Sequence, residues 1–477
     1  MLFNSWQFIF FFAVVLLLYF SIPYKWRTIL LLIASYIFYM AWKWEFAFLM
    51  LGVTALNYFT GRKIGQAKHK REKRLWLSVA LIFSLAPLVY YKYANFFLQN
   101  FVALLHKIGI HENINVLKVI LPVGISFFTF QALSYSLDVY RKRTEVESNF
   151  INFAVFVAFF PQLVAGPIER SSHLLAQFRE RHHFDSTLFL EGSKLFIWGL
   201  FKKVVIADRL APYVDRIYDS PDLYSGTTLA VATLFFAIQI YCDFSGYSDM
   251  AIGSARILGF RLMQNFNLPY LASSIGNFWK RWHISLSSWF GDYLYIPLGG
   301  NRVSYPRWVF NIFTVFLVSG FWHGANWTFI AWGALHAFYY LVESWGDKVL
   351  KLFSLTYVKQ SGAYKVFKIV SVFIMVCFAW IYFRANSISD AYLISKKIIL
   401  NFNGNLYLGA STVTFALSVL LILLLMTIQL LQYFNIASIY FSRPRIHPAL
   451  QFAWYICLLC GISLLGMSSS AFIYFQF

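Results

Sequence analysis

The histidine at position 323 stands where a titratable side chain is least expected, inside the apolar stretch "GFWHGANW". A neutral imidazole tolerates an apolar site, where desolvation disfavours its charged form and leaves it available as a base. Gly320 and Gly324 would let another backbone or a slender acyl chain approach closely. On a helix, Asn326 and Trp327 would share the face of His323 and supply an orienting hydrogen bond and a wall. We therefore predict that His323 is catalytic, the alternative being a helix-packing histidine whose neighbouring glycines serve tight interhelical contact.

A second candidate, His283, lies in the segment "FWKRWHISLSSWF". If this segment is helical, His283 and Ser287 share one face and Trp282 lies on another. Lys280 and Arg281 could stay at a membrane surface or hold an anionic group such as a phosphate or a thioester-linked carrier. We predict His283 as the second catalytic residue, with Trp282, Arg281 and Ser287 orienting a substrate.

Carboxylates occur close to an apolar segment in "YCDFSGYSDMAIGSARILGF", where Asp243 and Asp249 flank a Ser-Gly pair. Either carboxylate could be catalytic or could pair with Arg256 or Arg261 to fix a loop. Ion pairing is the favoured interpretation for most of them, and Asp243 is retained as a candidate orienting residue.

Other polar residues are expected to be structural. Glu169 and Arg170 follow a Gly-Pro break in "VAGPIERSSHL" and are expected to neutralise each other. His173 is expected to cap or flank a helix, and His336 in "AWGALHAFYY" to pack in the core.

The elements that must position these residues are apolar helices. The chain has 477 residues, of which 59% are hydrophobic and 13% charged, too few polar groups to cover a soluble protein of this size. A helix needs roughly 20 apolar residues to cross a bilayer, and the hydropathy pattern predicts about 11 such helices. The candidate spans are 6–22, 28–42, 44–60, 76–98, 117–139, 150–166, 190–206, 226–242, 308–346, 363–383, 412–434 and 449–468.

Three segments break this pattern because they are too polar to span: 161–185, 261–307 and 384–400. Such half-apolar segments lie at the membrane interface or re-enter and line a water-accessible cavity. We favour re-entry for 261–307, although its aromatic residues could also form an ordinary interfacial belt.

The charge balance suggests a topology. Lys and Arg number 40 against 20 Asp and Glu, a net charge of +20, which in a membrane protein indicates cytoplasmic loops and anionic lipid rather than nucleic acid. The densest basic loop is 61–74, so we place it in the cytoplasm. Counting back through three spans puts the N-terminus outside.

Four motifs occur in the order "PQLVAGPIER", "CDFSGYSDMAIGSARILGF", "NFWKRWHISLSSWFGDYLYIPLGGNR" and "GFWHGANWTFIAWGALHAFYY". Together they resemble the membrane-bound O-acyltransferase family, in its alginate O-acetyltransferase branch. The resemblance implies a ring of tilted helices around a central tunnel, with the near-invariant histidine at position 323 and the second polar active-site position at 283. It extends to about residue 345 and more faintly beyond. We therefore predict a single integral domain over 1–477, with a motif core at about 120–345 and C-terminal spans over 363–468.

The resemblance also implies a reaction. An acetyl group would pass from a cytosolic thioester, acetyl-CoA or an acyl carrier, across a bacterial inner membrane for O-acetylation of an extracellular polysaccharide. Partner proteins outside the cytoplasm would finish the transfer, and neither a bound cofactor nor a metal is expected. The chain contains no P-loop, dinucleotide-binding glycine motif, zinc-protease motif or nucleophile elbow. D-alanyl transfer toward teichoic acid from a carrier protein, and a transporter without chemistry of its own, stay open as alternatives.

Overall fold

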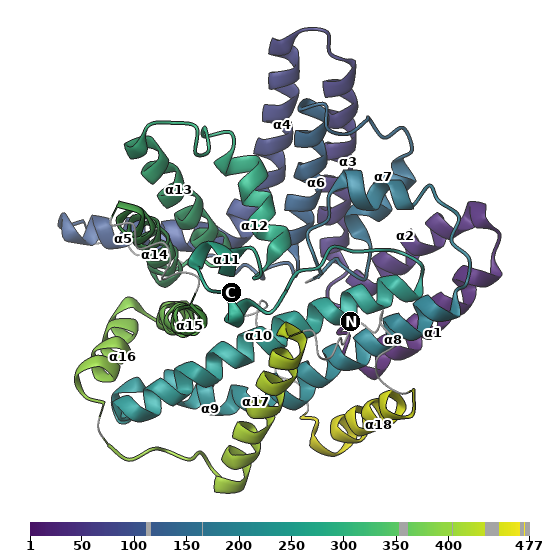
Figure 1. Cartoon of the computed structure of the whole chain (residues 1–477). Helices are drawn as coiled ribbons and strands as arrows, with labels where there is room; N and C mark the ends of the chain where they lie inside the picture. Colours follow the sequence, from purple (N-terminus) through teal and green to yellow (C-terminus); the bar gives the residue numbers. More distant parts are fainter. Residues whose placement is uncertain are drawn as a thin grey trace. The chain divides into compact units, whose positions relative to one another are not determined.

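The computed structural model describes residues 1–110, 116–164, 166–352, 361–402, 404–434, 448–467 and 472. All regular structure in these ranges is helical and no β-strand occurs in them, which confirms the predicted all-α class. The chain divides into two compact units (Figure 1). Unit 1 comprises Met1–Ser193 and Ala251–Met263, and unit 2 comprises Lys194–Met250 and Gln264–Phe477. That both belong to one integral domain stays a prediction.

Unit 1 is built from apolar helices joined by short turns. Its elements are α1 (Trp6–Ser21), α2 (Tyr24–Met40), α3 (Glu45–Gln66), α4 (Lys70–Leu88), the π-helical turn η1 (Val89–Tyr93), α5 (Ala94–Lys107), α6 (Ile125–Tyr140), α7 (Phe150–Ala158), the π-helical turn η2 (Ser171–Leu175) and the first half of α8 (Ser186–Phe201). Polar side chains cap the starts of α1 and α7: the Ser5 hydroxyl accepts a hydrogen bond from the Phe8 amide, and the Asn149 side chain accepts hydrogen bonds from the Ile151 and Asn152 amides.

Helices α3, α4 and α6 pack side by side (Figure 1). A buried polar residue of α3, Asn57, links the three helices. Its amide nitrogen donates to the Ser84 hydroxyl of α4 at 2.8 Å, and its amide oxygen accepts from the Ser136 hydroxyl of α6 at 2.8 Å. Hydrogen bonds of this kind add to apolar packing where helices meet away from water.

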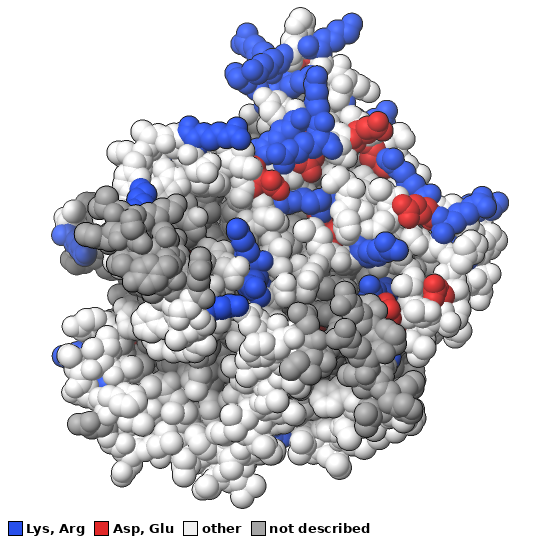
Figure 2. All heavy atoms as spheres, viewed as in Figure 1, with Lys and Arg blue, Asp and Glu red and all other residues white. Residues whose placement is uncertain are grey.

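The basic loop 61–74 lies at the junction of α3 and α4. Figure 2 shows Lys and Arg side chains gathered at this end of the two helices. The cationic side chains of the loop are exposed or half-buried: Arg62, Lys63, Lys68, Lys70, Arg71, Lys73 and Arg74. This position, at one end of apolar helices, is what a loop on one side of a membrane requires.

Unit 2 contains the motif-bearing segments. Its elements are the second half of α8, the π-helical turn η3 (Lys202–Ala207), α9 (Asp208–Tyr218), η4 (Pro221–Leu223), most of α10 (Gly226–Ile257), η5 (Pro269–Leu271), α11 (Ile275–Trp279), α12 (Ile284–Phe290), the π-helical turn η6 (Gly291–Tyr295), α13 (Tyr305–His323), α14 (Trp327–Leu352), α15 (Gly362–Arg384), α16 (Ile388–Leu400), α17 (Thr412–Tyr433) and α18 (Pro448–Leu465). Helices α13 and α14 form an extensive pair, and α15 packs on α14 (Figure 1).

Among the described residues, four helices are long and apolar enough to cross a membrane: Lys70–Lys107, Gly226–Ile257, Gly362–Arg384 and Thr412–Tyr433. Two shorter apolar helices cover Trp6–Ser21 and Phe452–Leu465. The predicted count of about 11 spans therefore stays a prediction beyond these helices.

Several predicted spans differ from the structure. In the 117–139 stretch the helix α6 begins only at Ile125, and the helix over 226–242 continues to Ile257 as α10. The 150–166 stretch contains a helix of only 9 residues, α7, which at 1.5 Å per residue is far shorter than a bilayer core. Its helix ends before Pro161, and Ala165 lies outside the described residues. The 308–346 stretch forms two helices rather than one, because α13 ends at His323 and α14 begins at Trp327.

Candidate active site

His323 is the last residue of α13 and is buried, with 3% of its surface exposed. Gly324 follows in extended backbone and ends the helix. Aromatic rings from two other helices pack edge-on against the imidazole: Trp332 of α14 at 5.1 Å between centroids and Phe383 of α15 at 5.4 Å. The environment is therefore the apolar, water-poor one that the sequence suggests.

His283 is completely buried and precedes α12 directly. Its backbone is left-handed, with φ 44° and ψ 54°, a conformation that costs energy for most residues. The ring meets Phe244 of α10 edge-on at 4.6 Å and lies 6.4 Å from the ring of His323, centroid to centroid. Two buried imidazoles from separate motifs thus face one small region of unit 2.

Asn265, which the sequence analysis did not single out, holds the backbone at His283. Its carbonyl accepts from the Ile284 amide at 3.0 Å, and its side-chain oxygen accepts from the Ser285 hydroxyl at 3.0 Å and the Ser285 amide at 3.3 Å. The Asn265 amide group in turn donates to the Ser248 hydroxyl of α10 at 3.3 Å. These bonds join α10, the 264–274 segment and α12, and so fix the turn that positions His283.

Glycines bring the backbones of α13 and α14 together beside His323. A Cβ on Gly320 would lie 2.2 Å from the Phe329 carbonyl oxygen, and one on Gly333 would lie 2.3 Å from the Phe316 carbonyl oxygen. Both positions therefore require glycine. The close backbone approach suggested for Gly320 is present, and it serves tight interhelical contact.

The expectation that Asn326 and Trp327 share a helical face with His323 is wrong. The helix is broken at Gly324, and the Asn326 side chain caps α14 by accepting from the Thr328 amide at 3.1 Å and donates to the Asn386 carbonyl at 3.3 Å. Trp327 is 54% exposed. The break follows from extended backbone at Gly324 and from a capping residue two positions before Thr328.

The helical pattern assumed around His283 is also wrong, because α12 begins only at Ile284. The Trp282 side chain is 1% exposed and packs on Phe266 at 5.1 Å and on Trp380 at 5.1 Å, so the structure places it in the aromatic packing around the site. The Ser287 hydroxyl donates to the Trp282 carbonyl at 3.2 Å and so closes the first turn after His283.

Arg281 forms its hydrogen bonds with residues other than the two histidines. Its Nε donates to the Asn277 side-chain oxygen at 2.8 Å and its Nη1 to the Asn267 carbonyl at 3.2 Å. It lines a cavity together with Lys280. The structure therefore groups these two cations with each other rather than with the imidazole pair.

The predicted partners of the α10 carboxylates were wrong. Asp243 pairs with Lys203 at 2.7 Å, and Asp249 pairs with Lys202 at 2.7 Å. Lys203 also pairs with Asp208 at 2.8 Å, so a cluster of buried ion pairs joins η3 to α10. Helices α8 and α10 approach each other closely because Gly199 faces Gly246: a Cβ on Gly199 would lie 2.5 Å from the Gly246 carbonyl oxygen. The sequence pattern near either residue does not reveal this contact.

Asp243 therefore lies in an ion-paired cluster beside the site rather than in it. It directly precedes Phe244, whose ring contacts His283. Removing one partner of a buried ion pair is strongly destabilising. Asp243 therefore stabilises α10 where this helix contacts His283.

His336 lies in a box of aromatic rings in unit 2. Phe278 and Phe316 stack on it at 6.1 and 6.2 Å, while Trp279 and Trp332 meet it edge-on at 5.0 and 4.9 Å. The residue is fully buried. This enclosure is compatible with the core-packing role expected for it.

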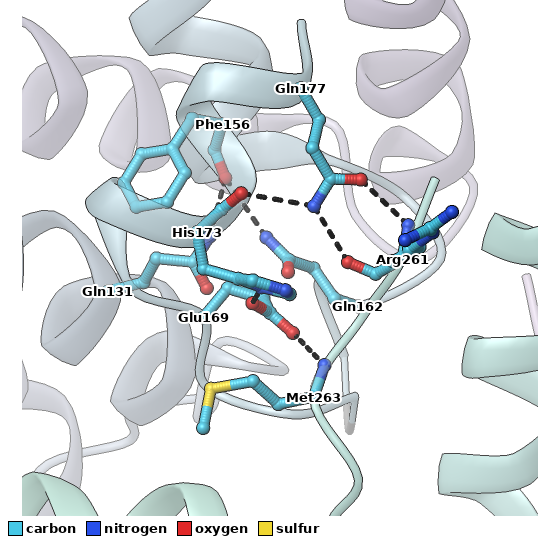
Figure 3. A network of polar contacts seen from close by, with 8 residues as sticks. All are labelled: Gln131, Phe156, Gln162, Glu169, His173, Gln177, Arg261 and Met263. Carbon is cyan, nitrogen blue, oxygen red and sulfur yellow. Dashed lines mark hydrogen bonds and ion pairs between the residues drawn. The ribbon is translucent and has the colours of Figure 1, made fainter. Parts of the chain in front are cut away.

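Unit 1 carries a separate polar network, drawn in Figure 3. His173 Nδ1 lies 2.7 Å from Oε2 of the fully buried Glu169, whose Oε1 accepts from the Met263 amide at 2.5 Å. Glu169 was expected to pair with Arg170; burial raises the pKa of the Glu169 carboxyl, and the charge of Arg170 does act to lower it. The hydrogen-bonding partners of this carboxyl are His173 and the Met263 amide. Gln177 extends the network by exchanging hydrogen bonds with the backbone of Arg261 at 2.9 and 2.8 Å.

Both groups of the Glu169–His173 pair have a raised pKa. Burial raises the pKa of the Glu169 carboxyl, and the hydrogen bond to Glu169 raises the pKa of the His173 imidazole. Both shifts favour a proton held between the two groups. The pair joins η2 to the 261–263 segment within unit 1.

No group of three or more His, Cys, Asp or Glu that could hold a metal ion occurs among the described residues. The chemistry that the histidine pair can supply is proton transfer and hydrogen bonding in a dry site.

Comparison with known proteins now adds to this geometry. The model of the membrane-bound O-acyltransferase family matches residues 73–388. The chain is 42% identical over 396 residues to a probable alginate O-acetylase of Azotobacter vinelandii, covering 82% of this chain and 77% of the relative. It is 37% identical over 395 residues to a peptidoglycan O-acetyltransferase of Helicobacter pylori, covering 77% and 73%. It is 27% identical over 278 residues to a teichoic acid D-alanyltransferase of Bacillus subtilis, covering 55% and 68%.

The matched range contains both histidines, the ion-paired cluster on α10 and the Glu169–His173 pair. The apolar helices of the fold agree with a membrane protein. The chain therefore belongs to the membrane-bound O-acyltransferase family and is an acyltransferase.

Proposed function

We propose that this acyltransferase takes an acetyl group from a cytosolic thioester donor and passes it across a bacterial inner membrane for O-acetylation of an extracellular polysaccharide. The similarity to relatives named alginate O-acetylase and peptidoglycan O-acetyltransferase, at 42% and 37% identity, supports acetyl as the group. The proposal includes about 11 spans arranged as a ring around a tunnel, an N-terminus outside, and extracytoplasmic proteins that complete the transfer.

The observation that carries the mechanism is the buried pair of imidazoles, 6.4 Å apart between ring centroids. At this separation two groups can act on one reacting centre from different sides. The surrounding rings of Trp332, Phe383 and Phe244 keep water away, which protects an activated acyl group from hydrolysis.

His323 acts as the general base. It removes the proton of the acceptor hydroxyl while the hydroxyl oxygen attacks the thioester carbonyl carbon. His283 donates a hydrogen bond to the carbonyl oxygen as negative charge develops there. The new carbon–oxygen bond forms, the carbon–sulfur bond breaks, and the proton held by His323 passes to the leaving thiolate.

The test replaces His323 by Ala and by Gln and follows labelled acetyl from acetyl-CoA into polymer in membranes. General base catalysis contributes about 10²–10⁴-fold, so both variants should lose at least about 100-fold of the rate while inserting normally. His183→Ala is the matched control, because His183 is exposed and lies in unit 1. Polymer acetylation that persists in both His323 variants would remove the mechanism.

A second candidate is D-alanyl transfer, favoured by the similarity to the teichoic acid D-alanyltransferase of Bacillus subtilis. The same membranes supplied with a D-alanyl carrier protein in place of acetyl-CoA distinguish the two. Incorporation from the carrier alone would replace acetyl by D-alanyl in the proposal and leave the roles of the histidines unchanged.

A further inference from the structure

The last turn of α15 carries both a ring that packs on His323 and an ion pair. The rings of Phe383 and Trp332, which we call the aromatic wall, meet the imidazole edge-on at 5.4 and 5.1 Å and each other at 5.3 Å. Arg384, the next residue after Phe383, ends α15 and donates from Nη2 to Oδ1 of Asp215 in α9 at 2.6 Å. All of these residues belong to unit 2. Because Phe383 and Arg384 are neighbours in one helical turn, a shift of the ion pair also shifts the ring.

The carboxylates that receive Arg384 lie at the unfavourable end of their own helix. Asp215 is in the last turn of α9, and Asp219 directly follows that helix, with Oδ1 3.9 Å from the Arg384 guanidinium. Negative charge at a helix C-terminus is unfavourable, because the last carbonyl groups already carry partial negative charge. These carboxylates therefore do not stabilise α9 by themselves, and the cation of Arg384 offsets their charge.

A buried ring orients the Arg384 guanidinium. Its Cζ lies 5.5 Å from the centroid of the Tyr218 ring, which is completely buried and whose hydroxyl lies 2.8 Å from that of Thr233 in α10. The Arg384 side chain is 12% exposed, whereas that of Asp215 is 42% exposed. The ion pair therefore lies at the boundary between the buried aromatic wall and the exposed surface of unit 2.

A second connection joins the segment after Arg384 to the turn after His323. The Asn326 side chain donates to the Asn386 carbonyl at 3.3 Å, and the Asn386 side chain donates to Oδ1 of Asp219 at 3.4 Å. Asn326 also caps α14. The end of α9, the turn between α13 and α14, and the end of α15 are therefore linked beside the imidazole.

We propose that Arg384 is a positioning residue whose ion pair with Asp215 holds Phe383 against His323 and keeps water from the imidazole. This inference rests on the proposed role of His323 as the base. Without the pair, the last turn of α15 loses its fixed position and the aromatic wall opens.

An open wall changes the products of the reaction. Water then competes with the acceptor hydroxyl, and His323 takes one proton from it as its oxygen attacks the thioester carbonyl carbon. The carbon–sulfur bond breaks, the proton passes from His323 to the leaving thiolate, and acetic acid is released in place of an acetylated polymer.

The experiment compares Arg384→Gln and Asp215→Asn with the parent protein in membranes supplied with labelled acetyl-CoA. It measures the ratio of acetate released to acetyl transferred, which does not depend on how much protein is folded. An ion pair this exposed contributes little to stability, so both variants should fold. Both should raise the ratio about tenfold or more and lower kcat more than they change KM.

Two related variants test whether the pair acts as a unit. The double variant should raise the ratio no further than Arg384→Gln alone, because each substitution removes the same interaction. Arg384→Lys keeps the charge without the planar guanidinium and should recover part of the parent ratio. Fully additive effects of the two substitutions would overturn the proposal.

Two controls separate positioning from loss of charge and loss of stability. Arg216→Gln removes an exposed cation of α9 that lies over the Tyr407 ring at 5.5 Å. Lys397→Gln removes the ammonium group that joins α16 to the 221–224 turn through three carbonyls at 2.6 to 3.1 Å. Lys397→Gln should lower the melting temperature, and neither control should change the ratio.

A second measurement needs no acyl donor. The rate at which diethyl pyrocarbonate modifies His323 in the purified protein, followed by mass spectrometry, reports the access of a small reagent to the imidazole. This rate should rise about tenfold in Arg384→Gln and stay at the parent value in Lys397→Gln. An unchanged rate in Arg384→Gln overturns the proposal, as does an unchanged ratio of release to transfer.

The two measurements fail separately from the proposed function. If His323 variants kept their activity, the base would be refuted while the difference in modification rate would stand. If the parent transferred no acetyl, the donor would be refuted, and the modification rate would still decide the role of Arg384.

Discussion

Adding one methyl group at Gly320 should separate α13 from α14 and disable the enzyme. The Cβ of an alanine at this position would lie 2.2 Å from the Phe329 carbonyl oxygen, whereas ordinary contact begins at 3.4 Å. The obstructing atom is backbone and cannot rotate away, so the two helices must part by roughly 1 Å. Because His323 is on α13 and Trp332 on α14, the imidazole moves by a similar amount against its packing partner.

A displacement of about 1 Å at a reacting group can cost on the order of 10²-fold in rate. Overpacking of this kind costs about 1–3 kcal/mol of stability, which leaves a folded protein to measure. We therefore expect Gly320→Ala to insert into membranes, to melt at a lower temperature in detergent, and to transfer acetyl groups roughly 100-fold more slowly. Gly333→Ala, which creates the reciprocal clash with the Phe316 carbonyl, should behave alike.

The matched control is Gly346→Ala in α14, where no described atom outside the local helix backbone lies within 4 Å of the added methyl group. This variant should keep the parent rate and should be as stable or slightly more so, because alanine favours a helix by about 1 kcal/mol over glycine. If Gly320→Ala transfers acetyl at the parent rate, the close contact between α13 and α14 does not position any group that catalysis needs, and the reasoning is refuted.

Two further predictions concern residues that position the site or hold unit 1 together. Asn265→Ala should lower kcat about tenfold or more with a smaller effect on KM, because it releases the turn at His283. Asn265→Asp keeps the accepting oxygen and should recover part of the rate. An equal loss of rate in both variants would contradict a positioning role. Because the pKa values of Glu169 and His173 are raised in the folded protein, protonation of these groups stabilises the fold at low pH. This stabilisation is lost as the pH rises through the raised pKa of His173. The melting temperature should therefore fall from pH 6 to pH 9. Glu169→Gln should flatten that fall, whereas Glu191→Gln, which removes a partly exposed carboxylate 3.4 Å from Arg256, should not; an unchanged profile in Glu169→Gln would refute the assignment.

The sequence predicted those features that depend on residues close together in the chain. The length and hydropathy of the apolar segments predicted the helical class, and the motifs around His323 and His283 singled out two residues whose rings lie 6.4 Å apart in the structure. Their catalytic roles are proposals that the variants above will test. The basic loop 61–74 also lies at one end of its helices, as its charge suggested.

The features missed depend on contacts between distant segments or on a single backbone angle. Nothing near Asp243 indicates that its partner is Lys203, some forty positions earlier, because the pairing follows from how η3 packs on α10. The break after His323 was hidden by uninterrupted hydropathy, although Gly324 and Asn326 together form a stop-and-cap signal that could have been read. Asn265 has no signal in its neighbourhood, since its role is visible only once α12 lies against it.

The left-handed backbone at His283 restricts which amino acids can occupy this position without strain. A His283→Ala variant loses the imidazole and also places alanine in a conformation that is roughly 1–2 kcal/mol unfavourable for most L-residues. A loss of activity in this variant would therefore combine the missing imidazole with backbone strain. Glycine relieves the backbone and supplies no side chain, while asparagine tolerates the angle and keeps a hydrogen-bonding group. The difference between glycine and asparagine at 283, rather than the effect of alanine, is therefore what isolates the contribution of a polar side chain at this turn.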